Sequence, residues 1–174
     1  MSDEKMDGSG HVGRDRIPLV IDRSRWYRGL GEIGSALLRK IDGKMCCLGF
    51  ASLASGADPG EIMNVGAPDG SVFERLVPEG MRVGYTESRY VETTSPIPGE
   101  RIVALLMVLN DKEWPGHCRG WSSIREWEAA KEEMVAAGLC LLGFDVEFVD
   151  VQPGPHRPVS ILTQRSFRIL DNMV

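Results

Sequence analysis

One stretch of the sequence combines residue types that bind phosphate groups with residue types that stack on bases. Within residues 22–34, three arginines surround two aromatic residues and three glycines follow: Arg23, Arg25, Trp26, Tyr27, Arg28, Gly29, Gly31 and Gly34. Guanidinium groups make charge-assisted hydrogen bonds to phosphate oxygens, glycine-rich backbone presents amides to anions, and aromatic rings stack on bases. These residues are therefore candidate ligand-binding residues for a nucleotide. The competing interpretation is a solvated basic patch with Trp26 in the core.

The glycines at positions 29, 31 and 34 have the Gly-x-Gly-x-x-Gly spacing of dinucleotide-binding proteins. Their context differs from that of such a site, because no strand directly precedes them and no clean helix opens after them. An acidic residue about 20 positions further on in a βαβ unit is also missing. The spacing therefore predicts no Rossmann-type cofactor site.

A second candidate is the pair Asn110 and Asp111, which follows a strongly apolar segment. Asp111 could point into a pocket and bind a ligand hydroxyl or amine. Alternatively, the pair could cap the carbonyls of a buried helix and begin a turn. Both interpretations are compatible with the sequence.

The residue types of nucleophilic and metal-assisted catalysis occur in no supportive pattern. Cys46, Cys47, Cys118 and Cys140 include no Cys-x-x-Cys pair, so the usual zinc spacing is missing. Cys118 follows His117, but neighbours in an extended loop point apart. We expect Cys46 and Cys47 to be buried small hydrophobes. The sequence favours a binding protein over an enzyme, with no catalytic residues, metal or cofactor expected.

The overall charge limits the range of partners. The chain has 174 residues, a net charge of −5 and a pI near 5.3. A protein that holds nucleic acid along its backbone usually has a basic footprint, so direct nucleic-acid binding is not expected. No apolar run approaches the roughly 20 residues that span a bilayer, and residues 1–13 do not resemble a signal peptide. We expect no membrane association and a cytoplasmic location.

The elements that would position these residues predict one α+β domain over residues 17–174, preceded by a flexible polar arm over residues 1–16. Residues 17–21 are typical of an edge strand, since Pro18 cannot donate to a ladder. We expect a short helix ending near Arg28, then a glycine loop. Asp42-Gly43 predicts a hairpin of residues 35–40 and 44–47.

Downstream, helices are expected over residues 48–55, after Asp58-Pro59, over 101–109 and over 124–137. The last helix begins at a Ser123–Glu126 capping box and ends at Gly138, with Lys131 facing water. Residues 66–80 are expected to be mostly loop, and 81–92 one or two exposed strands. Residues 139–149, 159–163 and 167–170 are further strand candidates. The predicted fold is a set of central buried helices packed on an antiparallel sheet.

Part of this pattern resembles a known family. The run Gly-Lys-Met-Cys-Cys-Leu-Gly-Phe at residues 43–50, the run Leu-Met-Val-Leu-Asn-Asp at 106–111 and an amphipathic segment at 124–137 are similar to a family of small phage proteins. The similarity covers roughly residues 25–140. The chain departs from it in an insertion over residues 66–99 and in the part after Leu139. The resemblance implies a phage origin and an accessory role, and no catalytic residues.

Two functional hypotheses follow. The first is a phage counter-defence protein in the cytoplasm of an infected bacterial host that sequesters a small anionic nucleotide signal without catalysis. The second is an acidic protein–protein inhibitor of a host defence enzyme or nucleic-acid-binding complex, suggested by the net charge and the acids of the 124–137 helix. Whether the protein forms a homo-oligomer stays open.

Overall fold

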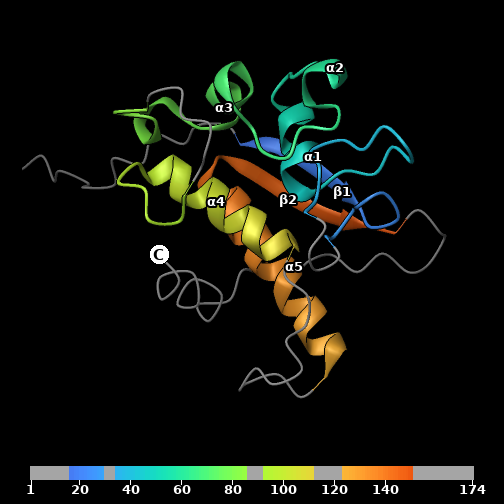
Figure 1. Cartoon of the computed structure of the whole chain (residues 1–174). Coiled ribbons are helices and arrows are strands. Elements are labelled where there is room, and N and C mark those ends of the chain that lie inside the picture. The colour runs from blue at the N-terminus through green and yellow to red at the C-terminus, as the bar shows by residue number, and fades with distance from the viewer. Residues whose placement is uncertain (1–15, 30–33, 86–91, 112–122, 151–174) are drawn as a thin grey trace, which may run out of the picture.

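The computed structural model describes residues 16–29, 34–85, 92–111 and 123–150. In chain order, its elements are β1 (Ile17–Asp22), α1 (Cys47–Ala54), α2 (Pro59–Ile62), α3 (Gly70–Leu76), the 3-10 helix η1 (Glu79–Met81), α4 (Pro98–Asp111), α5 (Ile124–Leu141) and β2 (Phe144–Val149). Helices therefore make up most of the regular secondary structure of this α+β fold (Figure 1). Residues 1–15 of the predicted 1–16 arm, the candidate ligand-binding residue Gly31 and the strands predicted at 159–163 and 167–170 lie outside the described residues.

The sheet consists of two parallel strands, so the predicted antiparallel sheet is wrong. β1 pairs with β2 from Ile17 opposite Phe144 to Asp22 opposite Val149. The helices lie between these two strands in the sequence, and this long connection returns the chain to the starting end of the sheet, as parallel pairing requires. Alternation of apolar residues predicts a strand and its buried face, but it contains no information about strand direction.

One face of the sheet packs against the helices, and the other face is exposed to solvent. Leu19, Ile21, Phe144 and Phe148 are buried, whereas the alternate positions are exposed: Pro18, Val20, Asp145 and Glu147. A two-layer arrangement results, with β1 against α1 and β2 against α5.

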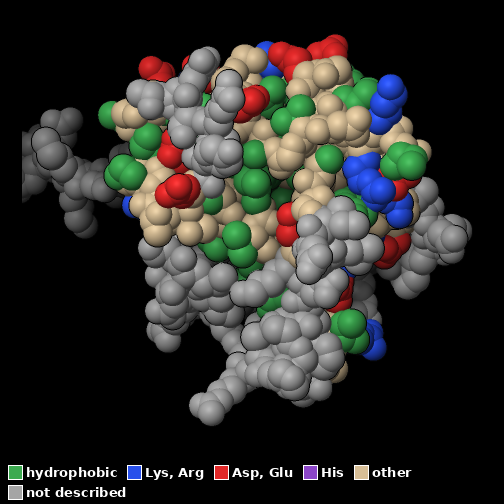
Figure 2. Space-filling model, viewed as in Figure 1, with side chains coloured by type: hydrophobic (Ala, Val, Ile, Leu, Met, Phe, Trp, Pro, Cys, Tyr) green, Lys and Arg blue, Asp and Glu red, His purple; other side chains and the backbone are tan. Residues whose placement is uncertain are grey.

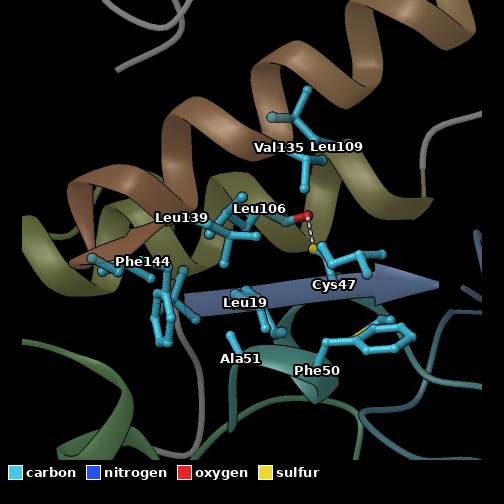
Figure 3. Close-up of a cluster of buried hydrophobic side chains, with 14 of the residues drawn as sticks. Leu19, Cys47, Phe50, Ala51, Leu106, Leu109, Val135, Leu139 and Phe144 are labelled. Carbon is cyan, nitrogen blue, oxygen red and sulfur yellow. Dashed lines mark hydrogen bonds between the residues drawn. The ribbon is translucent and has the colours of Figure 1, made fainter. Parts of the chain in front are cut away.

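Three helices meet in this core. Figure 3 shows buried side chains of β1, α1, α4, α5 and β2 in contact: Leu19, Cys47, Ala51, Leu106, Leu109, Val135, Leu139 and Phe144. Gly138 allows α5 to approach α4, because a Cβ at this position would lie 2.8 Å from Leu106 Cδ2. The predicted central helix is confirmed as α4, and the predicted helix after the cysteines as α1.

Local signals at helix ends were informative in two places and misleading in one. Asp58 and Glu61 form the capping box of α2, and the Ser123 hydroxyl accepts from the Glu126 amide at the start of α5. Gly138, however, does not end α5, which continues to Leu141 because this turn packs on α4. The turn after it contains Gly143, at φ +97°.

Two further predictions are wrong, and a third is wrong over the described part of its range. Residues 66–80, expected to be mostly loop, contain α3, whose Val72, Phe73 and Leu76 are buried. Strands were predicted over residues 81–92; residues 81–85 and 92 form none, and residues 86–91 lie outside the described residues. No helix ends near Arg28; instead the chain turns after β1, and Trp26 makes an isolated parallel bridge with Met45. In these cases tertiary contacts outweigh weak local propensities.

The predicted hairpin around Asp42-Gly43 is reduced to one antiparallel bridge between Leu38 and Met45. Gly43 adopts φ +68°, as the turn requires. Met45 therefore lies between two segments. Its backbone is hydrogen-bonded to Arg25 and Tyr27 on one side, and on the other side it faces Leu38, where the bonds are made by the flanking residues Lys44 and Cys46. Among the described helices, none is long and apolar enough to cross a membrane.

Candidate functional site

Arg23 and Arg28, two of the three arginines expected to bind phosphate, are bound to carboxylates of the protein itself. Arg23 donates from Nε and Nη2 to the two oxygens of Glu132, both at 2.8 Å, and its Nη1 lies 3.2 Å from Asp150 Oδ2. The hydrogen bond to Glu132 raises the pKa of Arg23. Arg28 pairs with Glu128 and lies 3.3 Å from Glu132. The fold thus provides internal anions where the sequence suggested a ligand.

The two functional hypotheses consequently draw on the same charges. Glu128 and Glu132 belong to the acidic helix that suggested an inhibitor, and they neutralise the arginines that suggested a phosphate site. Burial lowers the pKa of Arg28, and Glu132 opposes that shift. These two acids and the two arginines that they contact therefore neutralise one another within the protein.

Trp26 is a core residue and cannot stack on a base. Its side chain is only 4% exposed, its ring lies 5.2 Å from that of Phe148, and the Arg28 guanidinium covers it at 4.2 Å. Its indole Nε1 donates to Asn110 Oδ1 at 2.7 Å. Of the two interpretations of Trp26, the one that places it in the core agrees with its burial.

Asn110 is fully buried and connects three segments. Its Oδ1 also accepts from the Cys47 amide at 3.2 Å, and its Nδ2 donates to the Tyr27 carbonyl at 3.1 Å and to Asp111 Oδ1 at 3.0 Å. Lys131, predicted to face water, is buried and donates from Nζ to the Asn110 carbonyl at 2.9 Å. Asn110 therefore holds the 25–29 segment and the start of α1 against the end of α4.

Asp111 faces the glycine segment. Its Oδ2 accepts from the Ser35 amide at 3.1 Å, and a Cβ at Gly29 would lie 2.7 Å from Asp111 Oδ1. Gly29 is thus required for close approach to a carboxylate of the protein, in a position where the sequence suggested approach to phosphate.

Cys46 and Cys47 are buried, and their thiols lack the exposure and the lowered pKa that a cysteine nucleophile needs. Burial raises the pKa of the Cys46 thiol to about 11 from an ordinary value of 9.0, and raises that of Cys47 well above its ordinary value. The Cys47 thiol contacts the Leu106 carbonyl at 3.9 Å (Figure 3). The expectation that both are buried small hydrophobes is confirmed.

An alkylating reagent applied to the folded protein below about pH 9 should modify half-buried Cys140 well before Cys46 or Cys47, since only thiolates react readily. Peptide mapping by mass spectrometry identifies the modified positions. Rapid labelling of Cys46 in the folded protein would contradict its assignment as a buried thiol.

The raised pKa of the Cys46 thiol also predicts how stability depends on pH. Its contribution to the free energy of unfolding should be fully present below about pH 9 and be lost as the pH rises through about 11, because the thiol ionises first in the unfolded chain.

The positive charges that remain available lie around the 39–44 turn. We define the basic face as Arg25, Arg39, Lys40 and Lys44, together with Tyr27. Backbone bonds place its segments side by side: the Met45 amide donates to the Arg25 carbonyl at 2.9 Å, and the Arg39 amide to the Lys44 carbonyl at 2.8 Å. The Arg39 guanidinium lies over the Tyr27 ring at 4.0 Å.

Of the cations of the basic face, only Arg39 forms an ion pair with a described residue, with Asp42 at 3.2 Å. Arg25 and Lys40 are exposed and Lys44 is half-buried. Figure 2 shows Lys and Arg side chains at the right-hand edge of the molecule, the side on which Figure 1 places the turns after β1 and before α1. Arg25 and Tyr27 were predicted as candidate site residues, whereas Arg39, Lys40 and Lys44 were not, although their clustering around Asp42-Gly43 in the sequence was a usable signal.

An open hollow of about 360 Å³ lies elsewhere, on the outer side of α4. Ala104, Met107 and Val108 form one wall, and Glu92, Thr93 and Thr94 form the other. It shares no residue with the basic face. Within the part of the chain that the structure describes, no three His, Cys, Asp or Glu side chains converge as a metal site would require.

Comparison of the chain with known protein families, curated proteins and solved structures finds no match.

Proposed function

We propose that this protein is a phage accessory protein of the counter-defence class that sequesters a small anionic nucleotide without catalysis, through the basic face. The observation that carries the proposal is the position of charge. In a chain of net charge −5, four cations lie on neighbouring segments around the 39–44 turn, with the Arg39 guanidinium over the Tyr27 ring. Three of the four form no ion pair with a described residue. The phage origin and the counter-defence role come from the sequence resemblance.

Electrostatics favours an anionic ligand at this surface. The four cations and the nearby Asp42 carboxylate give the basic face a formal charge of +3, and uncompensated charge of one sign attracts the opposite sign from solution. Arg25 and Arg39 offer planar donor groups suited to phosphate oxygens. Arg25 differs from Arg23 and Arg28, whose donors already have carboxylate acceptors, whereas Arg39 shares its charge with Asp42.

We expect no catalysis at the basic face, because the side chains near it provide no activated nucleophile. Cys46, the nearest thiol in sequence, is 2% exposed, and burial holds its pKa near 11. Within the described residues, the basic face contains donors and an aromatic ring but no activated nucleophile beside a base. The bound ligand should therefore be released unchanged.

Replacing Arg25 and Lys44 by alanine should abolish nucleotide binding while the fold is kept, since both side chains lie outside the core. The measurement is thermal stability against a panel of linear and cyclic nucleotides. A ligand at about a hundred times its dissociation constant stabilises by about 2.7 kcal/mol. Chromatography of the ligand released by heat distinguishes sequestration from catalysis.

The matched control is Arg75→Ala with Arg125→Ala, which removes the same charge from exposed positions on α3 and α5. This control should bind as the wild type does. Equal affinity in the Arg25→Ala, Lys44→Ala variant and in the control would overturn the proposed site. Recovery of an altered nucleotide would make the protein an enzyme.

The alternative function, an acidic inhibitor of a host defence protein, would use Asp145 and Glu147, because both acids lie exposed on the outer face of the sheet. Glu128 and Glu132 are less suitable, since Arg23 and Arg28 pair with them. Salt-sensitive capture of a host protein that is lost in Asp145→Asn with Glu147→Gln, without any nucleotide effect, would favour this alternative.

A further inference from the structure

The basic face has more positive charge than one phosphate group can neutralise. A single phosphate group carries about −1.5 to −2 charges near neutral pH, whereas the face has a formal charge of +3. We infer that the ligand is a polyphosphate ester, with at least two consecutive phosphate groups, and that the face recognises its charge and not its base. This inference rests on the proposed function of the same surface.

The spacing of the cations supports several phosphate groups. Arg25, Lys44 and Arg39 lie on three neighbouring backbone segments joined by the bonds at 2.9 Å and 2.8 Å. Neighbouring extended segments lie about 4.8 Å apart, and a charge-assisted hydrogen bond spans only about 2.7–2.9 Å. Although Arg39 belongs to the third segment, its guanidinium lies over the Tyr27 ring of the first segment at 4.0 Å. The basic face therefore has donors from three segments, and a chain of phosphates can contact several of them.

Recognition of a base finds little support on this face. Trp26 is buried, and one side of the Tyr27 ring is covered by the Arg39 guanidinium at 4.0 Å. The hollow on α4 contains a carboxylate, Glu92, and none of the basic-face residues. Base-selective sites are usually concave and largely apolar, so phosphate contacts must supply most of the affinity here.

Isothermal titration calorimetry of the full chain against AMP, ADP, ATP, GTP and inorganic tripolyphosphate tests the inference. We expect ATP to bind at least about tenfold more tightly than AMP, GTP to match ATP within about threefold, and tripolyphosphate to compete with ATP. Raising the salt concentration from about 50 to about 200 mM should weaken ATP binding on the order of tenfold, as expected for a few released counterions. The Arg25→Ala, Lys44→Ala variant should bind none of the five probes measurably.

Equal affinity for AMP and ATP, or a preference for one base above tenfold, would overturn the inference and leave the proposed binding function standing. Failure of tripolyphosphate to compete would show that the nucleoside is required, which also overturns it. Failure of all five probes to bind would overturn the inference, and failure of the whole panel of linear and cyclic nucleotides to bind would overturn the proposed function as well.

Discussion

Replacing Gly49 by alanine should unfold the protein or reduce its free energy of unfolding by at least about 3 kcal/mol, because overpacking against rigid backbone is strongly destabilising. Gly49 lies in the first half of α1, where a Cβ would be 1.8 Å from the Leu37 carbonyl oxygen and 2.7 Å from its carbon. This atom is backbone, so it cannot rotate away. Urea denaturation followed by circular dichroism measures the loss.

The expected sign of this effect makes it a sharp test. In an ordinary helix, alanine is more favourable than glycine by roughly 1 kcal/mol, so an open position would give a stabilised variant. Gly66→Ala, in a bend outside the helices, is the control for an added methyl group, since no heavy atom beyond its chain neighbours lies within 4 Å of the added Cβ and its φ is not positive. A Gly49→Ala variant as stable as this control would show that α1 and the 37–38 segment are further apart than described.

Replacing Asn110 by alanine should lower the free energy of unfolding by about 3 to 5 kcal/mol, since each buried group left without a partner costs roughly 1–3 kcal/mol. The variant leaves the Trp26 indole, the Cys47 amide and the Tyr27 carbonyl without their bonds to Asn110. All three segments meet at the end of α4, where little water can enter to replace the amide. The measurement is the midpoint and slope of urea unfolding.

A double-mutant cycle with Trp26→Phe separates the hydrogen bond from general packing. Once Asn110 is removed, the indole N–H has already lost its acceptor, so Trp26→Phe should cost less in that background than in the wild type. Val108→Ala, at a 42% exposed neighbouring position, is the packing control and should change stability by no more than about 0.5 kcal/mol. Strict additivity of the two substitutions would contradict a coupled network.

These two positions also explain the runs that stood out in the sequence. Gly49 closes the Cys-Cys-Leu-Gly run because α1 packs directly on backbone, and Asn110 ends the α4 segment because it bonds to the beginning of α1. Of the two interpretations of the Asn110–Asp111 pair, neither ligand binding nor simple capping describes what Asn110 does. Its side chain joins separate segments of the core.

Local features of the sequence determined several helices. The apolar run of α4, the Asp58–Glu61 capping box and the Ser123–Glu126 signal depend on residues within a few positions of one another, so they could be identified without knowledge of the fold. Burial of Cys46 and Cys47 was also predicted, because the cysteines have no metal-ligand spacing and a free cysteine behaves as a small hydrophobe. The direction of the strands was not predicted correctly, because the alternation of apolar residues is identical in parallel and antiparallel strands.

The identity of the free charges was decided by the tertiary structure alone. Arg23 and Glu132 are 109 positions apart, and nothing local indicates that they pair, whereas Arg25, two residues from Arg23, remains exposed. The sequence contained the cations and the acids. Only the packing of α5 beside the segment after β1 determined which of them neutralise each other and which face solvent, because ion pairing depends on distance in space and not along the chain.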